Sequence, residues 1–164
     1  MTNENRITLY ENDFYDSGER KEETRNIVIF KLSDEWYGLE ASRIREVIEV
    51  KNITYLPSSP AHIMGIINLR GTIMSITDLK VLLNLPAQDI TENTRYIIIE
   101  NENVQTGLLA DEVYKIMNVP LSKIKPALTT IASEKADYLE GECKFDQKLI
   151  GILRVNKILE TREK

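Results

Sequence analysis

The feature that most restricts the fold of this chain is the shortness of its apolar runs. About nine or ten runs, rich in Ile, Val, Leu and aromatic residues, are separated by turn-forming Gly, Asn, Asp and Pro, and no long amphipathic helix interrupts them. Many short strands with frequent turn signals are typical of a β-sandwich or of small barrels. We therefore predict an all-β fold, although we find no internal repeat in the sequence.

The clearest local structure is a hairpin near the middle of the chain. Apolar and polar residues alternate over 67–70, which predicts a half-buried strand with Arg70 on its polar face. Gly71-Thr72 suits a two-residue type II′ turn into a second strand over 73–76. Asp78 then predicts the N-cap of a short helix. The hairpin would present Arg70 beside a glycine turn.

Two helical turns are predicted before this hairpin. Within 42–47, Ile44 and Val47 are three residues apart, which would place them on one side of a short helix. Ser59-Pro60 predicts the start of another helix, with serine as the N-cap and proline at the first helical position, and Gly65 would end it.

Composition excludes several classes of protein. The net charge of −5 and the pI near 5.1, without a cluster of Lys and Arg, argue against nucleic-acid binding. No apolar run approaches the roughly 20 residues that cross a bilayer, so we expect no membrane insertion. One cysteine cannot form an internal disulfide, and one cysteine with one histidine cannot make an ordinary zinc site. We expect a cytoplasmic protein without metal or cofactor.

The chain divides into a polar beginning and a folded remainder. Residues 1–25 are highly charged and are interpreted as a flexible N-terminal tail, with a partner-docking segment as the alternative. We expect residues 26–162 to form the folded domain.

Candidate catalytic residues are few. Cys143 falls in the apolar phase of an alternating segment, which indicates a small buried side chain. His62 is interpreted as a packed or surface histidine, and the alternative is a small all-β hydrolase that uses it with a nearby serine and carboxylate. Arg70 has two interpretations, a surface arginine paired with Glu46 or Asp78, or an interface anchor that grips a carboxylate.

Several motifs resemble one family. Gly65-Ile66-Ile67-Asn68-Leu69-Arg70-Gly71, followed by Ile76-Thr77-Asp78-Leu79, resembles the central signature of the CheW family of chemotaxis coupling proteins. Four further segments are similar to family motifs in the expected order: Tyr37 to Leu39 with Ile44 to Val47, Leu56-Pro57 with Pro60, Gly107 to Val113, and Tyr138 to Gly141. The resemblance extends from about residue 26 to residue 160.

The chain departs from the family pattern at three positions. It has Ser75 and Thr77 where the family usually has proline and then isoleucine or valine, and Ala110 where the family usually has valine. These are strand positions, so we expect local adjustments of packing or pairing within the same fold.

The resemblance implies two small five-stranded barrels, Src-homology-3-like, packed around a shared hydrophobic seam. It also implies a non-catalytic adaptor, monomeric when free, that links the cytoplasmic tips of methyl-accepting chemoreceptors to the regulatory domain of the histidine kinase CheA in membrane-associated receptor arrays. The alternatives within the family are a coupling protein of a non-flagellar chemosensory pathway and a member that has lost receptor binding and only fills positions in the array.

The resemblance also assigns partner-binding residues. The first contact region comprises Ile44, Glu46, Gly65, Asn68 and Arg70, and the second comprises Val113 and Ile116. Arg70 and Glu46 would supply directed charge, Gly65 a close backbone approach, and the second region apolar area. Ile44 and Val113 have a second interpretation as core residues.

Overall fold

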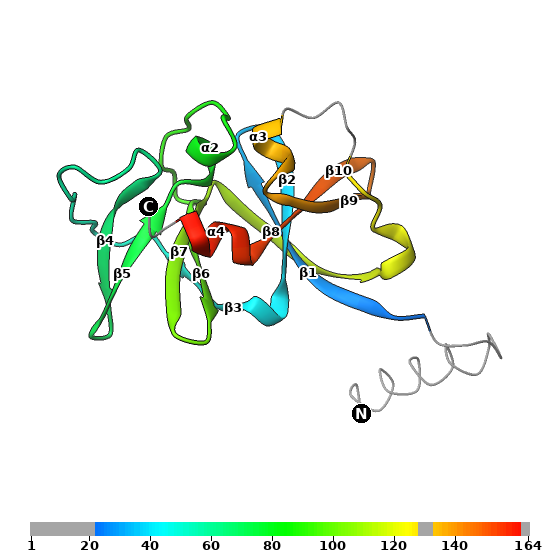
Figure 1. The fold of residues 1–164 in the computed structure, drawn as a ribbon, viewed down its shortest axis with the longest axis horizontal. Coiled ribbons are helices and arrows are strands. Elements are labelled where there is room, and N and C mark those ends of the chain that lie inside the picture. Colours follow the sequence, from blue (N-terminus) through cyan, green and yellow to red (C-terminus); the bar gives the residue numbers. More distant parts are fainter. Residues whose placement is uncertain (1–21, 128–132, 162–164) are drawn as a thin grey trace.

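The computed structural model describes residues 22–127 and 133–161, which form ten strands and a few short helices (Figure 1). The predicted all-β class is confirmed. The strands are β1 Thr24–Leu32, β2 Glu35–Glu40, β3 Ile44–Glu49, β4 Ile63–Leu69, β5 Thr72–Thr77, β6 Arg95–Asn101, β7 Val104–Ala110, β8 Glu112–Pro120, β9 Leu139–Phe145 and β10 Lys148–Leu153. The helices are η1 Ala41–Arg43, α2 Leu79–Leu82, η2 Leu121–Lys123, α3 Ser133–Ala136 and α4 Val155–Thr161.

The strands form two five-stranded sheets that lie side by side, with α4 in front of their junction (Figure 1). The first sheet has the order β8-β1-β2-β10-β9, and the second has the order β3-β6-β7-β5-β4. Strand β3 follows β2 in the chain but joins the second sheet, whereas β8 follows β7 but joins the first. The second sheet is therefore formed by the consecutive strands β3 to β7, whereas the first is formed by β1 and β2 together with β8, β9 and β10.

The two sheets repeat one topology. In each sheet an antiparallel hairpin, β1-β2 or β6-β7, pairs in parallel with the second strand of another hairpin, β9-β10 or β4-β5. A further edge strand, β8 or β3, completes the sheet beside β1 or β6. The sequence does not reveal this repeat because equivalent positions in the two sheets carry different residue types.

The expected closed barrels are not found as continuous ladders, because the strand pairing of each sheet stops at two free edges. One isolated bridge joins those edges in each sheet. Thr54, after β3, bridges Ile66 in β4, and Lys125, after β8, bridges Glu142 in β9. Each sheet is thus strongly curved, with its edges meeting at a single point.

Three groups of buried side chains hold the sheets together. The largest fills the seam between the sheets and includes Phe30, Ile97 and Leu108, with Ile158 of α4 covering it. Each sheet also encloses its own inner core, around Ile29 and Ile150 in the first and Ile76 and Ile98 in the second. Burial of these apolar side chains contributes most of the stabilisation, at roughly 1.5–3 kcal/mol for each large residue.

A bulge at the same place in β3 and β8 sets which side chains face the seam. Arg45 has no partner in the ladder with β6, and Tyr114 has none in the ladder with β1. A bulge adds one residue, so side chains two positions apart point to opposite faces. Ile44 consequently packs on the seam, whereas Glu46 lies opposite Ile98 on the inner face of the second sheet.

Some local predictions are wrong. The helical turn expected over 42–47 is η1 followed by strand β3, and no helix begins at Ser59-Pro60, where two turn residues lead into β4. The central hairpin and the Asp78 N-cap are confirmed, since Asp78 Oδ1 accepts a hydrogen bond from the Lys80 N–H at 3.0 Å. The hairpin turn lies one residue earlier than expected.

Candidate docking site

The predicted contact residues lie on both sheets, and only some of them come together. Glu46 of β3 and Arg70, which follows β4, form an ion pair although their strands are the two opposite edges of the second sheet. The curvature of the sheet brings these edges together. The Arg70 side chain is 66% exposed and that of Glu46 is 26% exposed. The prediction that Arg70 pairs locally is therefore met, with Glu46 as its partner.

The turn that carries Arg70 has a backbone conformation that few residues adopt. Arg70 and Gly71 have φ values of 50° and 88°, which is the pattern of a type I′ turn and not the expected type II′ turn. Asn68 stabilises this turn because its Oδ1 accepts a hydrogen bond from the Gly71 N–H at 2.8 Å. Asn68 thus positions Arg70, and its side chain is already used within the hairpin.

Three further polar side chains extend this charged surface. Arg45, the bulge residue, lies 3.2 Å from Glu100 Oε2, and the Gln105 side-chain amide donates to the same oxygen at 3.2 Å. We call Arg45, Glu46, Arg70, Glu100 and Gln105 the second-sheet rim. Sequence patterns gave no signal for Arg45 or Glu100, because only the strand register brings β3 and the end of β6 together.

A groove of about 550 Å³ lies beside this rim, between β5 and the β6-β7 turn. It forms because β5 and β7 pair only at Ile76 and Thr77 and then diverge. Ile73 lines the groove and is 58% exposed. An exposed apolar side chain flanked by an ion pair is the usual composition of a protein-binding surface.

At Gly65 the backbone of β4 lies close to the backbone of Thr54 in the same chain. A Cβ at this position would lie 2.3 Å from the carbonyl oxygen of Thr54, and its φ is 152°. This is the point at which the isolated Thr54–Ile66 bridge joins the edges of the sheet. Gly65 is buried inside β4, so the expectation that it ends a helix is wrong.

Ile44 on β3 and Val113 on β8 occupy equivalent positions in the two sheets. Both are half-buried and pack against the seam core, opposite Ile99 and Phe30 respectively. This packing agrees with the interpretation of both residues as part of the core. Their contact with a partner stays a prediction.

Ile116 differs from Val113, since 64% of the residue is exposed. It pairs with Val28 in β1, on the same face as Val113 but farther from the seam. Val47 is its equivalent in β3 and is 40% exposed. Strands β3 and β8 therefore each carry one exposed aliphatic side chain on the same face as a seam residue.

His62 has a structural partner. Its Nε2 lies 3.0 Å from the carbonyl oxygen of Thr161 in α4, so the ring donates a hydrogen bond there. Among residues 22–127 and 133–161, no serine or carboxylate bonds to the ring, and no group of acidic, histidine or cysteine side chains could hold a metal ion. Nothing in the geometry of His62 favours the hydrolase alternative.

Comparison with protein families decides the classification. A family model described as a CheW-like domain matches residues 26–163. The chain belongs to this family. The match covers the strands of both sheets.

Relatives and a solved structure agree with this assignment. The chain is 28% identical over 134 residues to the chemotaxis protein CheW of Bacillus subtilis, covering 82% of this chain and 86% of the relative. It is 27% identical to protein FrzA of Myxococcus xanthus, covering 80% and 83%. The crystal structure of the scaffolding protein TtCheW from Thermoanaerobacter tengcongensis superposes with a TM-score of 0.75 at 33% identity, covering 84% of this chain and 88% of that one.

The three departures from the usual CheW pattern change local contacts. The Ser75 hydroxyl lies 3.0 Å from the hydroxyl of Thr106, which donates to the Ser75 carbonyl at 2.9 Å. Thr77 is fully buried, and its hydroxyl has no hydrogen-bond partner among the described residues. Ala110 is buried in the seam core. The fold accommodates all three, as the sequence predicts.

Proposed function

We propose that this chain is a non-catalytic adaptor that couples the cytoplasmic tips of methyl-accepting chemoreceptors to the histidine kinase CheA. Membership of the CheW-like family supports the chemotaxis role, as do relatives named as chemotaxis proteins and a structural neighbour described as a scaffolding protein. None of the described helices has the length and apolar character needed to cross a membrane. The adaptor would act in the cytoplasm, at receptor arrays.

The second-sheet rim carries the proposal. Arg70 is held at a fixed position by its turn and by Asn68, yet two thirds of its side chain remains exposed. A partner carboxylate could therefore join or replace Glu46 without any rearrangement of the backbone. Arginine is suited to this role because its planar guanidinium donates to a carboxylate in two places.

Apolar area for binding lies on either side of the charged pair. Ile73 is exposed in the groove beside the rim, and Val47 is exposed on β3. Such side chains supply the hydrophobic part of an interface, whereas the charges fix its orientation. The second predicted region would use Ile116 in the same way, with Val113 holding its strand against the seam.

The mechanism follows from binding alone. The kinase would bind through its regulatory domain, which resembles this fold, and the receptor tip would bind to another surface of the same adaptor. A signal would then pass as a change in how receptor and kinase are held together. No step of this mechanism requires bond chemistry in the adaptor.

A binding titration tests the proposal. The full chain is titrated with the CheA regulatory domain and with a receptor-tip fragment from the same organism, and the dissociation constants are compared with those of Arg70→Ala. We expect saturable binding to both partners, with at least one affinity weakened about tenfold or more, which is about 1.4 kcal/mol.

Arg95→Ala is the matched control, because Arg95 lies at the opposite end of β6 and, within the part of the chain that the structure describes, its side chain donates only to the carbonyl oxygens of Glu92 and Thr94. It should leave both affinities unchanged. Saturable binding with equal affinity for Arg70→Ala would remove Arg70 as the anchor. Failure of the wild-type chain to bind either partner would remove the adaptor function.

A further inference from the structure

The first sheet ends in a layer of lysine and aromatic side chains. Its inner face carries apolar columns, such as Ile27 and Ile29 on β1 and Ile152 and Ile150 on β10, that continue into Lys31 and Lys148. The other strands end in the same layer. We call the set the first-sheet rim: Lys31, Trp36, Tyr114, Lys115, Phe145 and Lys148.

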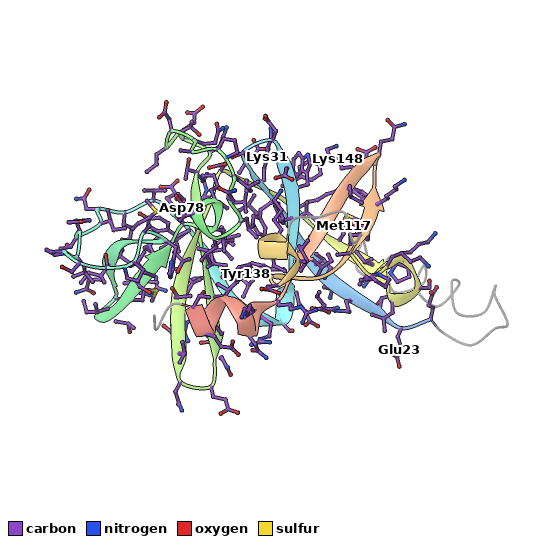
Figure 2. The ribbon with its side chains drawn as sticks, turned by 45° about the horizontal axis from the view of Figure 1, so that its top comes forward. Glu23, Lys31, Asp78, Met117, Tyr138 and Lys148 are labelled. Atoms are coloured by element: carbon purple, nitrogen blue, oxygen red, sulfur yellow. The ribbon has the colours of Figure 1, made fainter. Side chains whose placement is uncertain are left out.

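The lysines of this rim lie over its rings. Lys115 Nζ is 4.5 Å from the centroid of Phe145 and 5.2 Å from that of Tyr114. Lys148 Nζ is 5.4 Å from the centroid of Trp36, and Lys31 Nζ is 5.7 Å from it. Cation–π contacts hold the ammonium groups at the surface. Figure 2 shows Lys31 and Lys148 close together, at the end of the first sheet away from Glu23.

Most of this positive charge is not balanced locally. In residues 22–127 and 133–161, neither Lys31 nor Lys115 forms an ion pair, and Lys148 has only Asp146 at 3.6 Å. The Asp146 side chain is 64% exposed, so this pair contributes little. A protein with a net charge of −5 therefore keeps Lys31 and Lys115 without an ion pair among the described residues, although Glu112 lies opposite Lys31 in the β1-β8 ladder.

The repeat makes this imbalance informative. In the second sheet the positions equivalent to Lys31 and Lys115 are Glu100 and Glu46, as the ladder registers and the two bulges define them. Those carboxylates are neutralised within the chain, by Arg45 and Arg70. The two rims occupy equivalent positions, but among the described residues Glu100 and Glu46 form ion pairs, whereas Lys31 and Lys115 do not.

One segment of the chain has the matching composition. Residues 11–16 read Glu-Asn-Asp-Phe-Tyr-Asp, with three carboxylates and two aromatic rings in six residues. Carboxylates complement the lysines, and aromatic side chains can stack on Trp36 and Tyr114, whose own rings meet at 5.4 Å. We propose that residues 11–16 bind the first-sheet rim of the same molecule.

The length of the chain permits this contact. Lys31 is seven residues beyond Thr24 on β1, a distance of about 23 Å at 3.3 Å per residue. The eight residues from Asp16 to Thr24 can span up to about 26–29 Å when extended. Residues 17–23 are thus long enough for the segment to reach the first-sheet rim. A linker this short gives the segment an effective concentration at the rim on the order of millimolar.

The contact adds a regulated surface to the fold. With residues 11–16 bound, the aromatic rings of the rim would be covered, and any partner that uses this rim must first displace the segment. This inference goes beyond the proposed function and does not rest on it. The experiment that tests it uses this protein alone, without any partner.

Trp36 provides the measurement because it is the single tryptophan of the chain and lies in the rim. Acrylamide quenching of its fluorescence is compared between the wild-type chain and Asp13→Lys/Asp16→Lys. We expect the quenching constant to rise about twofold in this variant, and to rise similarly in wild type at 1 M salt, where the Debye length falls to about 3 Å. Unchanged quenching in the variant overturns the proposal.

Glu4→Lys/Glu19→Lys is the matched control, since it makes the same change of net charge outside residues 11–16. The quenching constant of this control variant should equal that of wild type. A rise as large as in Asp13→Lys/Asp16→Lys would show that net charge, not the sequence of residues 11–16, causes the effect, and would overturn the proposal. Combining Asp13→Lys/Asp16→Lys with Lys31→Glu/Lys115→Glu should restore protection. Protection that appears only at high protein concentration would indicate a second copy as the occupant and overturn binding within one molecule.

Discussion

Lys80 Nζ lies 2.8 Å from Asp111 Oδ1, and only 2% of the lysine side chain is exposed. The other carboxylate oxygen accepts a hydrogen bond from the Ser33 N–H at 2.6 Å. Lys80 belongs to α2, beside the second sheet, whereas Ser33 lies in the β1-β2 turn of the first sheet. One carboxylate therefore joins the two sheets through a buried ion pair and a backbone contact.

Asp111→Ala should destabilise the fold by up to about 3–5 kcal/mol, because it removes the closer partner of a buried ammonium group and leaves only the Asp78 carboxylate, at 3.7 Å. The Ser33 N–H would lose its acceptor as well. Urea unfolding followed by circular dichroism measures the change. A loss below about 1 kcal/mol would mean that the pair is not effectively buried.

The control for this prediction removes both charges. Lys80→Met with Asp111→Asn keeps an oxygen for the Ser33 N–H and leaves no ammonium group unpaired, so it should recover most of the lost stability. Glu100→Gln breaks the exposed pair with Arg45 and should cost at most about 1 kcal/mol.

Tyr37 should make the fold sensitive to alkaline pH. Burial, aided by the negative charge of Glu35, raises the pKa of its hydroxyl well above the ordinary value of about 10. The unfolded chain releases this proton near pH 10 while the folded chain keeps it. Stability from this group is therefore complete below pH 10 and decreases above it, by about 1.4 kcal/mol for each further pH unit.

Tyr37→Phe removes this titration. At pH 8 the variant should lose only about 0.5–1.5 kcal/mol, since the hydrogen bond to Glu35 is 3.3 Å long. Its free energy of unfolding should then decrease less steeply than that of wild type between pH 9 and 11. Parallel curves for the two proteins would assign the alkaline loss to other groups, among which Tyr96 and Tyr138 also have raised pKa values from burial.

The wrong prediction of a helical turn over 42–47 has its physical origin in a bulge. Ile44 and Val47 are three residues apart, and this spacing indicated a helical turn. In the structure both side chains face the seam side of a strand, because the extra residue Arg45 shifts the alternation by one. A bulged strand and a helical turn give the same local pattern, so only the pairing with β6 distinguishes them.

The hairpin and its face were predictable because Ile67 and Leu69 alternate with Asn68 and Arg70 at the end of β4. The pairing of Arg70 with Glu46 could be named only as one alternative. It depends on two sheet edges meeting, which is a long-range property that no local pattern contains. The passage of the chain into the second sheet at β3, and its return to the first at β8, was unpredictable for the same reason.

Thr77→Val should stabilise the protein by about 1–3 kcal/mol. The Thr77 hydroxyl is buried without a partner among the described residues, and an unsatisfied buried polar group carries its full desolvation penalty. Thr106→Val is the control, because Thr106 is equally buried but donates to the Ser75 carbonyl at 2.9 Å. It should destabilise by about 0.5–1.5 kcal/mol. Denaturation midpoints that move in the same direction for both variants would contradict this account.

Gly65→Ala and Gly71→Ala should differ strongly although both glycines belong to the same hairpin. A Cβ at position 65 would lie 2.3 Å from the Thr54 carbonyl oxygen, so the edges of the second sheet must separate, and we expect a loss of at least about 3 kcal/mol. At position 71 nothing lies within 4 Å, and only the positive φ opposes alanine, at about 1–2 kcal/mol. Unfolding free energies in urea test the order, and equal losses would show that backbone conformation, not the Thr54 contact, requires Gly65. Because the edges carry Glu46 and Arg70, the Gly65 variant should also lose partner binding through the fold, without any direct contact of Gly65 with a partner.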